Sequence, residues 1–208
     1  MTLQNRNNNL KPYLLYLTFV LLPIVTHGQY APNEKLANTV DTVLLKSESF
    51  QDIEHLLRIL GDDTGKFKDQ FDYVPSINPL NPEKLDRFSS KFGERFHPID
   101  KKNKPHYGID ISAKAGTAIH AAASGTVKST VESDKGYGNQ VIIEHRYGFR
   151  SRYAHMYLFI VKKGDKVNKG DIIGFVGSTG KSTADHIHFE ISKNNIRIDP
   201  YPFCFLEI

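Results

Sequence analysis

The chain has 208 residues, of which 39% are hydrophobic and 24% are charged, as in an ordinary globular protein with one domain and some additional segments. Its net charge of +4 falls to +2 beyond residue 28, where 25 basic residues stand against 23 acidic ones. This balance excludes a charge-based argument for nucleic-acid binding, although an anionic polymer such as a cell wall stays open as a partner. The only cysteine, Cys204, has no partner for an internal disulfide or a shared zinc site, and we expect it in the core.

Residues 1–28 have the composition of an export signal. Arg6 and Lys11 form a short positive region, and the apolar stretch 13–25 is too short to span a bilayer comfortably. Small residues at its end would allow cleavage before Gln29, while an uncleaved anchor is the alternative. No cysteine follows the stretch, which argues against a lipoprotein. We therefore expect an exported protein, periplasmic or extracellular, with no stable membrane anchor after cleavage.

Residues 29–74 are predicted to form a helical N-terminal segment. Apolar residues recur at helical spacing through 34–60, and Gly61 is typical of a helix end. The stretch 47–49 (Ser-Glu-Ser) interrupts the pattern, so one long helix and two short ones fit equally well. Two roles are open for this segment, namely packing on the adjacent domain or shielding an active site.

A proline-rich linker is predicted at 75–87, because three prolines within 75–82 resist both helix and strand. Beyond it, residues 88–208 consist of short β-rich runs separated by glycines. This pattern predicts a mainly β domain, an antiparallel β-sandwich or barrel. The expected strands are 117–123, 126–131, 140–145, 150–157, 171–176 and 186–192.

Histidines and one aspartate in three short segments form the most informative pattern of the chain. The segments are His106-Tyr-Gly-Ile-Asp110, Tyr153-Ala-His155-Met156 and His186-Ile-His188-Phe-Glu190. If each is a strand, residues i and i+2 or i+4 face the same side, which pairs His106 with Asp110 and His186 with His188. Two imidazoles and a carboxylate suit Zn²⁺, and three protein ligands leave a fourth position for water. Two further histidines then remain for proton transfer, which is the inventory of a zinc hydrolase.

The order of these segments, with the glycines around them, resembles the lysostaphin/LytM-like zinc peptidases, a family of bacterial cell-wall endopeptidases. The similarity runs from about Phe88 to Phe203. H-x-x-x-D and H-x-H are weak signals alone, but in this order, with Y-x-H between them, they are strong together. The segments that carry the resemblance are 90–98, 106–110, 116–125, 136–139, 141–145, 153–156, 177–183 and 186–190.

The resemblance implies both a fold and a site. The family fold is a small antiparallel β-sandwich of the duplicated hybrid motif type, with a long groove that crosses the metal. By the resemblance, His106, Asp110 and His188 bind zinc. His155 and His186 then stand beside the metal as catalytic histidines. The family's substrates are the peptide bridges and stems of peptidoglycan.

Two positions before the H-x-H pair depart from the family pattern. Ala184-Asp185 stands where the family often has Gly-Pro, which changes the loop that delivers His186, while zinc binding is expected to survive. Glu190 is expected to share a face with His188, where it either orients that ligand or lies on the sheet surface. A structural hydrogen bond is expected for His145.

We therefore expect an exported zinc metalloendopeptidase that hydrolyses peptide cross-links or stem peptides of peptidoglycan. No separate wall-targeting domain follows the catalytic one in this sequence, which disfavours a secreted bacteriocin that cuts glycine bridges. A D-amino-acid stem cross-link in the producer's own wall is the preferred bond. The alternative on the same fold is a non-catalytic cell-wall-binding protein or an activator of other wall hydrolases, which the three retained ligands disfavour. A lipoyl or biotinyl carrier domain, suggested by the turns at 161–171, would leave the histidines unexplained.

Overall fold

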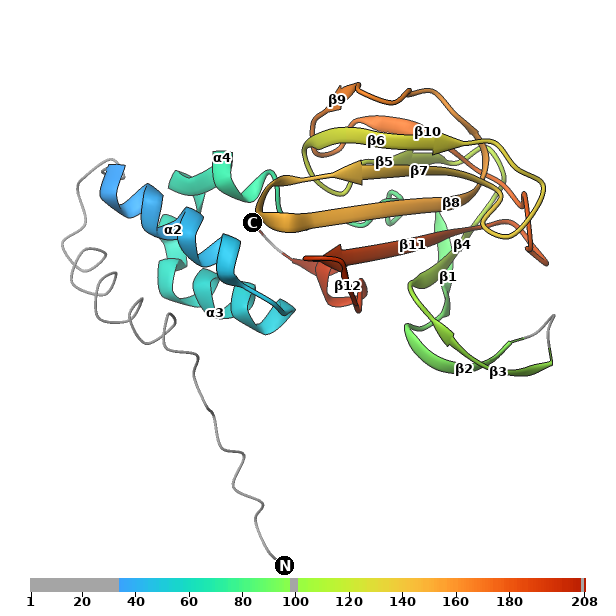
Figure 1. Cartoon of the computed structure of the whole chain (residues 1–208), viewed down its shortest axis with the longest axis horizontal. Coiled ribbons are helices and arrows are strands. Elements are labelled where there is room, and N and C mark those ends of the chain that lie inside the picture. The colour runs from blue at the N-terminus through green and yellow to red at the C-terminus, as the bar shows by residue number, and fades with distance from the viewer. Residues whose placement is uncertain (1–33, 98–100, 207) are drawn as a thin grey trace, which may run out of the picture. The chain divides into compact units, whose positions relative to one another are not determined.

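The computed structural model describes residues 34–97, 101–206 and 208 (Figure 1). The predicted export signal at 1–28 lies outside these residues. The described chain divides into two compact units, with the boundary between Phe67 and Lys68. No helix in the described part is long and apolar enough to cross a membrane.

The first unit is helical, as predicted, and contains two short helices rather than one long one. They are α2 (Glu34–Lys46) and α3 (Phe50–Leu60), followed by the 3-10 helix η1 (Gly61–Phe67). Ser49 begins α3 with a capping box, in which its hydroxyl accepts the amide hydrogen of Asp52 and the Asp52 carboxylate accepts that of Ser49. Gly61 ends the helix with a φ of 51°. The Ser-Glu-Ser interruption is therefore a helix start.

The second unit is an antiparallel β-domain, which confirms the predicted fold class. Its large sheet has the order β1-β4-β11-β8-β7-β6-β9, while β10 pairs with both β5 and β8, and β12 pairs with β11. The bounds are β1 (Leu85–Ser90), β4 (Ile109–Ala113), β5 (Ala118–His120), β6 (Gly125–Val131), β7 (Asn139–Glu144), β8 (Phe149–Phe159), β9 (Lys166–Val167), β10 (Ile172–Val176), β11 (His186–Lys193) and β12 (Ile196–Ile198). A strand therefore lies in each of the six stretches predicted to hold one.

The long strand β8 connects the two layers of this domain. Residues 149–154 pair with β11, whereas residues 156–159 pair with β10. The sheet therefore folds over on itself and encloses the core, as the ribbon shows (Figure 1). Outside this sheet, β2 (Gly93–His97) and β3 (Lys102–His106) form a separate two-stranded hairpin. The short elements α4 (Lys68–Phe71), η2 (Arg146–Gly148) and η3 (Pro202–Phe205) complete the unit.

The core lies against one face of β11. Along β11, Ile187, Phe189 and Ile191 are fully buried, and Phe189 contacts Tyr153 of β8 with ring centroids 5.3 Å apart. The alternate residues of β11 face the other side, because successive side chains of a strand alternate. Cys204 is buried as predicted, and burial raises the pKa of its thiol to about 12.

The proline-rich stretch after α4 is held against the β-domain by backbone hydrogen bonds. The amide of Ser76 donates to the carbonyl of Ala122 at 3.1 Å, and the amide of His120 donates to the carbonyl of Pro79 at 2.8 Å. β1 begins at Leu85, within the segment predicted as linker. The proposed division at 29–74, 75–87 and 88–208 remains a prediction.

Candidate metal centre

Strand pairing brings the second and third predicted ligands together. His188 of β11 lies directly opposite Asp110 of β4 in the register of the two strands. Side chains of directly opposite residues are close neighbours on one face. The Nδ1 atom of His188 accordingly lies 2.9 Å from Oδ1 of Asp110. Both residues are buried, so this contact is largely shielded from solvent.

His106 reaches the same point by a route that differs from the predicted one. The expectation that residues 106 to 110 form one strand is wrong: β3 ends at His106, and β4 begins at Ile109 in the other sheet. Between them, Gly108 passes so close to β11 that a Cβ atom would lie 2.3 Å from the carbonyl oxygen of Phe189. This tight crossing places His106 Nε2 3.2 Å from Asp110 Oδ1. The two side chains meet because the chain changes sheets there.

The three side chains offer a set of electron-pair donors around one point. His106 Nε2 and His188 Nδ1 are 3.0 Å apart, and each is within 3.2 Å of Asp110 Oδ1. Zinc ligands at about 2.0–2.2 Å in tetrahedral geometry would be roughly 3.3–3.6 Å from one another. The observed separations of 2.9 to 3.2 Å are slightly shorter, so a small outward movement of the three side chains would give that arrangement. Among the described residues, these three side chains form a group that could hold a metal ion.

The outer nitrogen of each ligand histidine fixes which ring atom faces this point. His106 Nδ1 donates to the carbonyl oxygen of Lys91 at 2.7 Å, so in the neutral ring its Nε2 carries the lone pair. His188 Nε2 donates to a carboxylate oxygen of Glu190 at 3.2 Å, so its Nδ1 carries the lone pair. In neutral rings, two lone pairs and a carboxylate would face one another with no hydrogen between them. A positive charge between these atoms, either a metal ion or a proton on one ring, relieves that repulsion.

The pKa shifts show the same demand for positive charge. Burial raises the pKa of Asp110, but hydrogen bonds to His106 and His188 outweigh it and hold that pKa well below its usual range. Burial lowers the pKa of His188, but hydrogen bonds to Asp110 and Glu190 outweigh it and raise that pKa. The residues present therefore fit a cation, and their mixed nitrogen and oxygen donors suit Zn²⁺.

Two residues that the sequence analysis did not assign complete the surroundings of the ligands. Arg95, on the β2–β3 hairpin, contacts the second carboxylate oxygen of Asp110 at 3.2 Å. Tyr137 donates its hydroxyl hydrogen to Glu190 at 2.6 Å. Glu190 is 5% exposed, which excludes the surface role left open for it and makes it the partner that orients His188. Arg95 and Tyr137 lie in segments that carry the family resemblance, but neither is a typical metal ligand, so nothing in the sequence singled them out.

A β-bulge turns His155 toward the ligands. Asn139 of β7 pairs with Met156 of β8, and Val141 pairs with Tyr153, so β8 carries one extra residue between these pairs. The bulge includes His155, whose φ is +60°. Bulges of this kind re-aim a side chain beside a site. The His155 ring consequently lies near those of His186 and His188, with centroid distances of 4.8 and 6.0 Å.

In both predicted catalytic histidines a hydrogen bond from Nδ1 fixes the ring, so that in the neutral form Nε2 carries the lone pair. His155 Nδ1 donates to the carbonyl oxygen of Thr179 at 2.8 Å, and His186 Nδ1 donates to that of Ala184 at 2.8 Å. Burial lowers the pKa of His155 to about 4, with a smaller opposing contribution from Thr179. His186 Nε2 lies 3.7 Å from Asp110 Oδ1, so it stands at the edge of the cluster.

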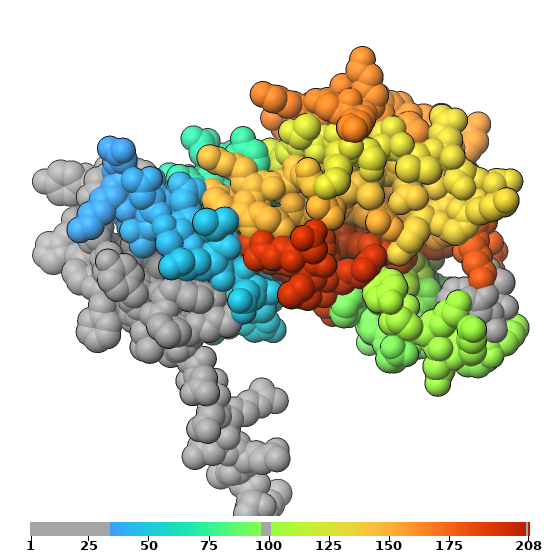
Figure 2. Space-filling view, viewed as in Figure 1, coloured from blue at the N-terminus to red at the C-terminus, as the bar shows by residue number. Residues whose placement is uncertain are grey.

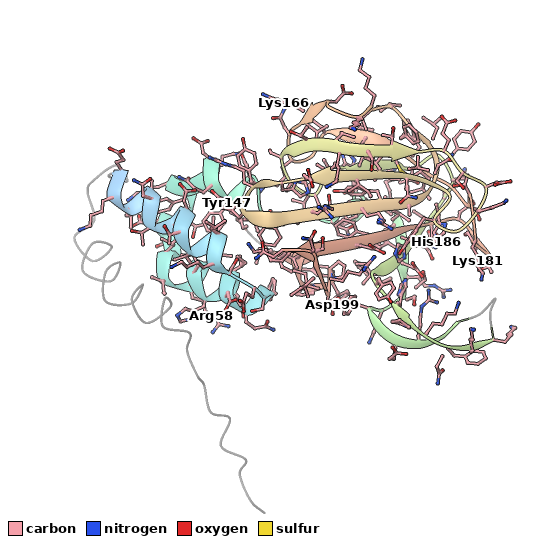
Figure 3. The ribbon with its side chains drawn as sticks, in the orientation of Figure 1. Arg58, Tyr147, Lys166, Lys181, His186 and Asp199 are labelled. Atoms are coloured by element: carbon pink, nitrogen blue, oxygen red, sulfur yellow. The ribbon has the colours of Figure 1, made fainter. Side chains whose placement is uncertain are left out.

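The loop before His186 orients this histidine through its backbone despite the unusual sequence. Ala184 acts through its backbone carbonyl, which accepts hydrogens from both His186 and the hydroxyl of Ser182. A backbone acceptor does not depend on the side chain at that position. Asp185 is exposed. Figure 3 shows His186 and Lys181 together at one end of β11, where this loop enters the strand.

The cluster opens into a cavity of about 260 Å³. Its walls come from β2, β3, β4, β8 and β11, from Tyr107 and from the loops at 136–137 and 181–183. They combine the four histidines and Asp110 with basic and aromatic side chains. The prediction for His145 concerns a place outside this cavity. His145 is buried and bonded to the carbonyl of Ser124 and the hydroxyl of Ser151, each at 2.8 Å, which confirms its structural role.

Comparisons with known proteins agree with this geometry. Residues 104–200 match the model of peptidase family M23. The chain is 43% identical over 122 residues to the DD-carboxypeptidase/endopeptidase Mpg of Neisseria meningitidis, a match that covers 58% of this chain and 28% of that protein. Across the curated relatives compared, the match spans between 24% and 34% of their length.

Solved structures share the fold of the β-domain. The catalytic domain of lysostaphin from Staphylococcus simulans is 36% identical, with a TM-score of 0.51, over 57% of this chain and 91% of that one. A zinc-containing peptidase from Vibrio cholerae is 29% identical, with a TM-score of 0.56, over 64% of this chain and 40% of that one. The match to the family model includes His106, Asp110 and His188. The chain therefore belongs to peptidase family M23, the family of the lysostaphin/LytM-like peptidases.

Proposed function

We propose that this protein is a zinc-dependent endopeptidase that hydrolyses peptide bonds of bacterial peptidoglycan. The observation that carries the proposal is the convergence of His106 Nε2, Asp110 Oδ1 and His188 Nδ1 on one buried point that requires a positive charge. Membership of family M23 supports the choice of zinc and of a wall peptide. His106, Asp110 and His188 are the proposed ligands, and His155 and His186 the proposed catalytic histidines.

Hydrolysis of an amide needs an activated water, relief of charge on the carbonyl oxygen and a proton for the leaving nitrogen. Zinc in such a site polarises the carbonyl and brings the pKa of a water into the neutral range. The protein's own part is proton transfer at Nε2 of His155 and His186, which are lone pairs in the neutral rings. Either ring can accept the proton of the attacking water and return it to the leaving nitrogen. The carbonyls of Thr179 and Ala184 hold both rings in this orientation.

The bond cleaved is proposed from the relatives. Mpg is described as a DD-carboxypeptidase/endopeptidase, which agrees with the expected D-amino-acid stem cross-link. A wall substrate also requires export, so we propose that residues 1–28 direct the protein to the periplasm or the cell exterior. The net charge of +2 beyond residue 28 is compatible with an anionic wall polymer.

The test separates metal binding from turnover. Wild-type protein should contain about one zinc per chain and release peptides from purified peptidoglycan. His106→Ala should lose both properties, whereas His155→Ala should keep most of the metal and lose turnover, because His155 is not a ligand. His120→Ala is the matched control: that ring is bonded to the carbonyl of Gly170 away from the cavity and should keep both.

Zinc content and peptide release have distinct failure patterns. If zinc-loaded wild-type protein releases no peptide from any wall preparation, the enzyme proposal is refuted in favour of a non-catalytic wall-binding protein. Metal-free protein with full activity would refute the zinc site itself. Mass spectrometry of the released fragments identifies the bond, and fragments without a cut at a D-amino acid would contradict the proposed specificity.

A further inference from the structure

We propose that the substrate groove continues past the metal ligands into an arginine subsite, made by Arg150, Arg152 and Arg197, that binds a carboxylate of the substrate peptide. The inference rests on the proposed function, which gives the groove a peptide substrate. The subsite lies along β11 on the side of Glu190 that is remote from His186. Its cavity has a volume of about 90 Å³, separate from that of the metal centre.

Strand register places these arginines on the face that carries the ligands. Along β11, His188, Glu190 and Ser192 are alternate residues and share a face. Glu190 lies opposite Arg152 of β8, and Ser192 lies opposite Arg150. On the other side of β11, Ser192 lies opposite Arg197 of β12. Two rows of side chains therefore extend the floor of the groove beyond His188.

A tight turn holds Arg197 in this position. Asn194 and Asn195 join β11 to β12, with φ values of 51° and 67°. Positive φ at both central residues is the type I′ arrangement, which fits the twist of a two-residue hairpin and favours asparagine. The hairpin returns the chain beside β11 in the same sheet. In Figure 2 the C-terminal segment that contains β12 lies at the accessible surface on the viewed face.

The charge of the cavity lining is unbalanced in favour of an anion. Glu190 is the single acid among the residues that line it, against three arginines. Glu190 already accepts hydrogens from His188 and Tyr137, and its contacts to Arg152 and Arg197 are long, at 3.6 and 3.5 Å. Arg150 contacts Glu144, outside the cavity lining, at 2.9 Å, and its buried Nε has no hydrogen-bond partner. Guanidinium hydrogens therefore remain for a bound anion.

The geometry favours a carboxylate on an extended peptide. Guanidinium groups present paired donors that match the two oxygens of a carboxylate. Ser192 lies four positions beyond His188, or about 13 Å along the strand at roughly 3.3 Å per residue. An extended peptide in the groove would cover that length with about four residues. The subsite would therefore select a substrate with an acidic group a few residues from the cleaved bond.

Two of the guanidinium groups lie over aromatic rings. The Arg152 guanidinium carbon lies 4.4 Å from the ring centroid of Tyr137, and that of Arg197 lies 4.3 Å from the centroid of Tyr107. Both tyrosines also line the metal cavity. The same rings thus border the metal cavity and position the arginines, so one peptide can contact both.

The experiment compares cross-linked stem peptides with free carboxylates and the same peptides after conversion to carboxamides. Dissociation constants are measured by calorimetry with the His155→Ala variant, which is expected to bind the peptides without cleaving them. KM and kcat are measured with the full wild-type chain. We expect about tenfold tighter binding of the carboxylate form, expressed in KM rather than kcat, and a decrease of this preference with salt. Equal binding of both forms would overturn the proposal, and this comparison needs no arginine variant.

Arg150→Gln then assigns the effect to the subsite, because Arg150 contacts Glu144 rather than Glu190. We expect the preference for the carboxylate to fall to about twofold, as one charged hydrogen-bond donor is lost. Lys128→Gln is the matched control, since Lys128 also pairs with Glu144 but does not line the cavity, and it should keep the full preference.

Retention of the full preference in Arg150→Gln would also overturn the proposal. Cleavage of both peptide forms at equal rates and affinities would refute the subsite and leave the proposed function intact. Preferential binding without any cleavage would support the subsite and refute the enzyme.

Discussion

Replacement of Glu190 by glutamine tests how the protein prepares His188 to bind a metal. Glu190 accepts the Nε2 hydrogen of His188 at 3.2 Å and the hydroxyl hydrogen of Tyr137 at 2.6 Å. These contacts outweigh burial and hold the pKa of Glu190 at about 2, so the group is ionised near neutral pH. The negative charge of Glu190 makes Nδ1 of His188, on the opposite side of the ring, a stronger electron-pair donor to a metal ion, and the hydrogen bond fixes the orientation of the ring.

The expected loss follows from what glutamine keeps and what it removes. A glutamine oxygen can still accept the hydrogen of His188, so orientation is partly retained while the charge is lost. Loss of a carboxylate behind a ligand histidine lowers metal affinity by about 10- to 100-fold. Glu190→Gln should therefore lie near the lower limit, about tenfold or about 1.4 kcal/mol. Glu190→Ala leaves two buried donors without an acceptor and should approach the upper limit.

Zinc affinity is measured by competition with a chromophoric chelator at constant pH and ionic strength. Glu144→Gln is the matched control, because this carboxylate pairs with Lys128 and Arg150 away from the metal centre and has a side chain 46% exposed. Its zinc affinity should stay within about twofold of wild type, as expected for a surface ion pair. A Glu190→Gln variant that folds normally and binds zinc as tightly as the control would refute the reasoning.

Two further predictions concern stability. Burial lowers the pKa of His145 from 6.5 to about 4, so between these pH values this ring is protonated in the unfolded chain and neutral in the folded protein. As the pH decreases through this window, His145 should contribute a fall of about 3 kcal/mol to the free energy of unfolding, in addition to any contribution of His155. Urea titrations should therefore show a smaller fall in His145→Gln than in wild type. Gly108→Ala places a Cβ atom against the backbone of Phe189. We expect it to lower the free energy of unfolding by about 1–3 kcal/mol and also to weaken zinc binding. Gly65→Ala is the control, because its Cβ atom would lie in open space, and it should change neither property.

Each of these stability predictions has a clear contrary result. Equal pH dependence of wild type and His145→Gln would show that the buried ring does not control the acid response. Normal zinc affinity in Gly108→Ala would show that the close crossing of the chain over β11 does not position His106. Both results would leave the proposed ligands unchanged.

Much of the fold follows from short-range sequence patterns. Glycines separate β-rich runs whose alternation is regular, so each of these runs contains a strand. The β2–β3 hairpin was not predicted, because Lys102–His106 consists of four polar residues and a proline and has no apolar alternation. That hairpin nevertheless supplies both His106 and Arg95 to the metal centre. Its place is fixed by contacts with Asp110 on another sheet, which no local pattern contains.

The position of His155 shows where alternation fails as a guide to the site. Tyr153 faces the core, where its hydroxyl oxygen accepts the amide hydrogen of Ala122 at 2.7 Å. In a regular strand His155, two residues further, would face the core as well. The bulge adds one residue, so Ala154 and His155 both lie toward the groove and Met156 returns to the core with no exposed surface.

The Y-x-H spacing alone therefore assigns His155 to the wrong face, and its usefulness comes from the resemblance. Regular pairing would place an imidazole in the core, where its ring nitrogens need hydrogen-bond partners. The bulge avoids this cost at the expense of a positive φ, which histidine tolerates better than most residues. The Thr179 carbonyl then secures the ring in its new direction. A strained backbone at this position is thus what makes a histidine on β8 available to a metal held by β3, β4 and β11.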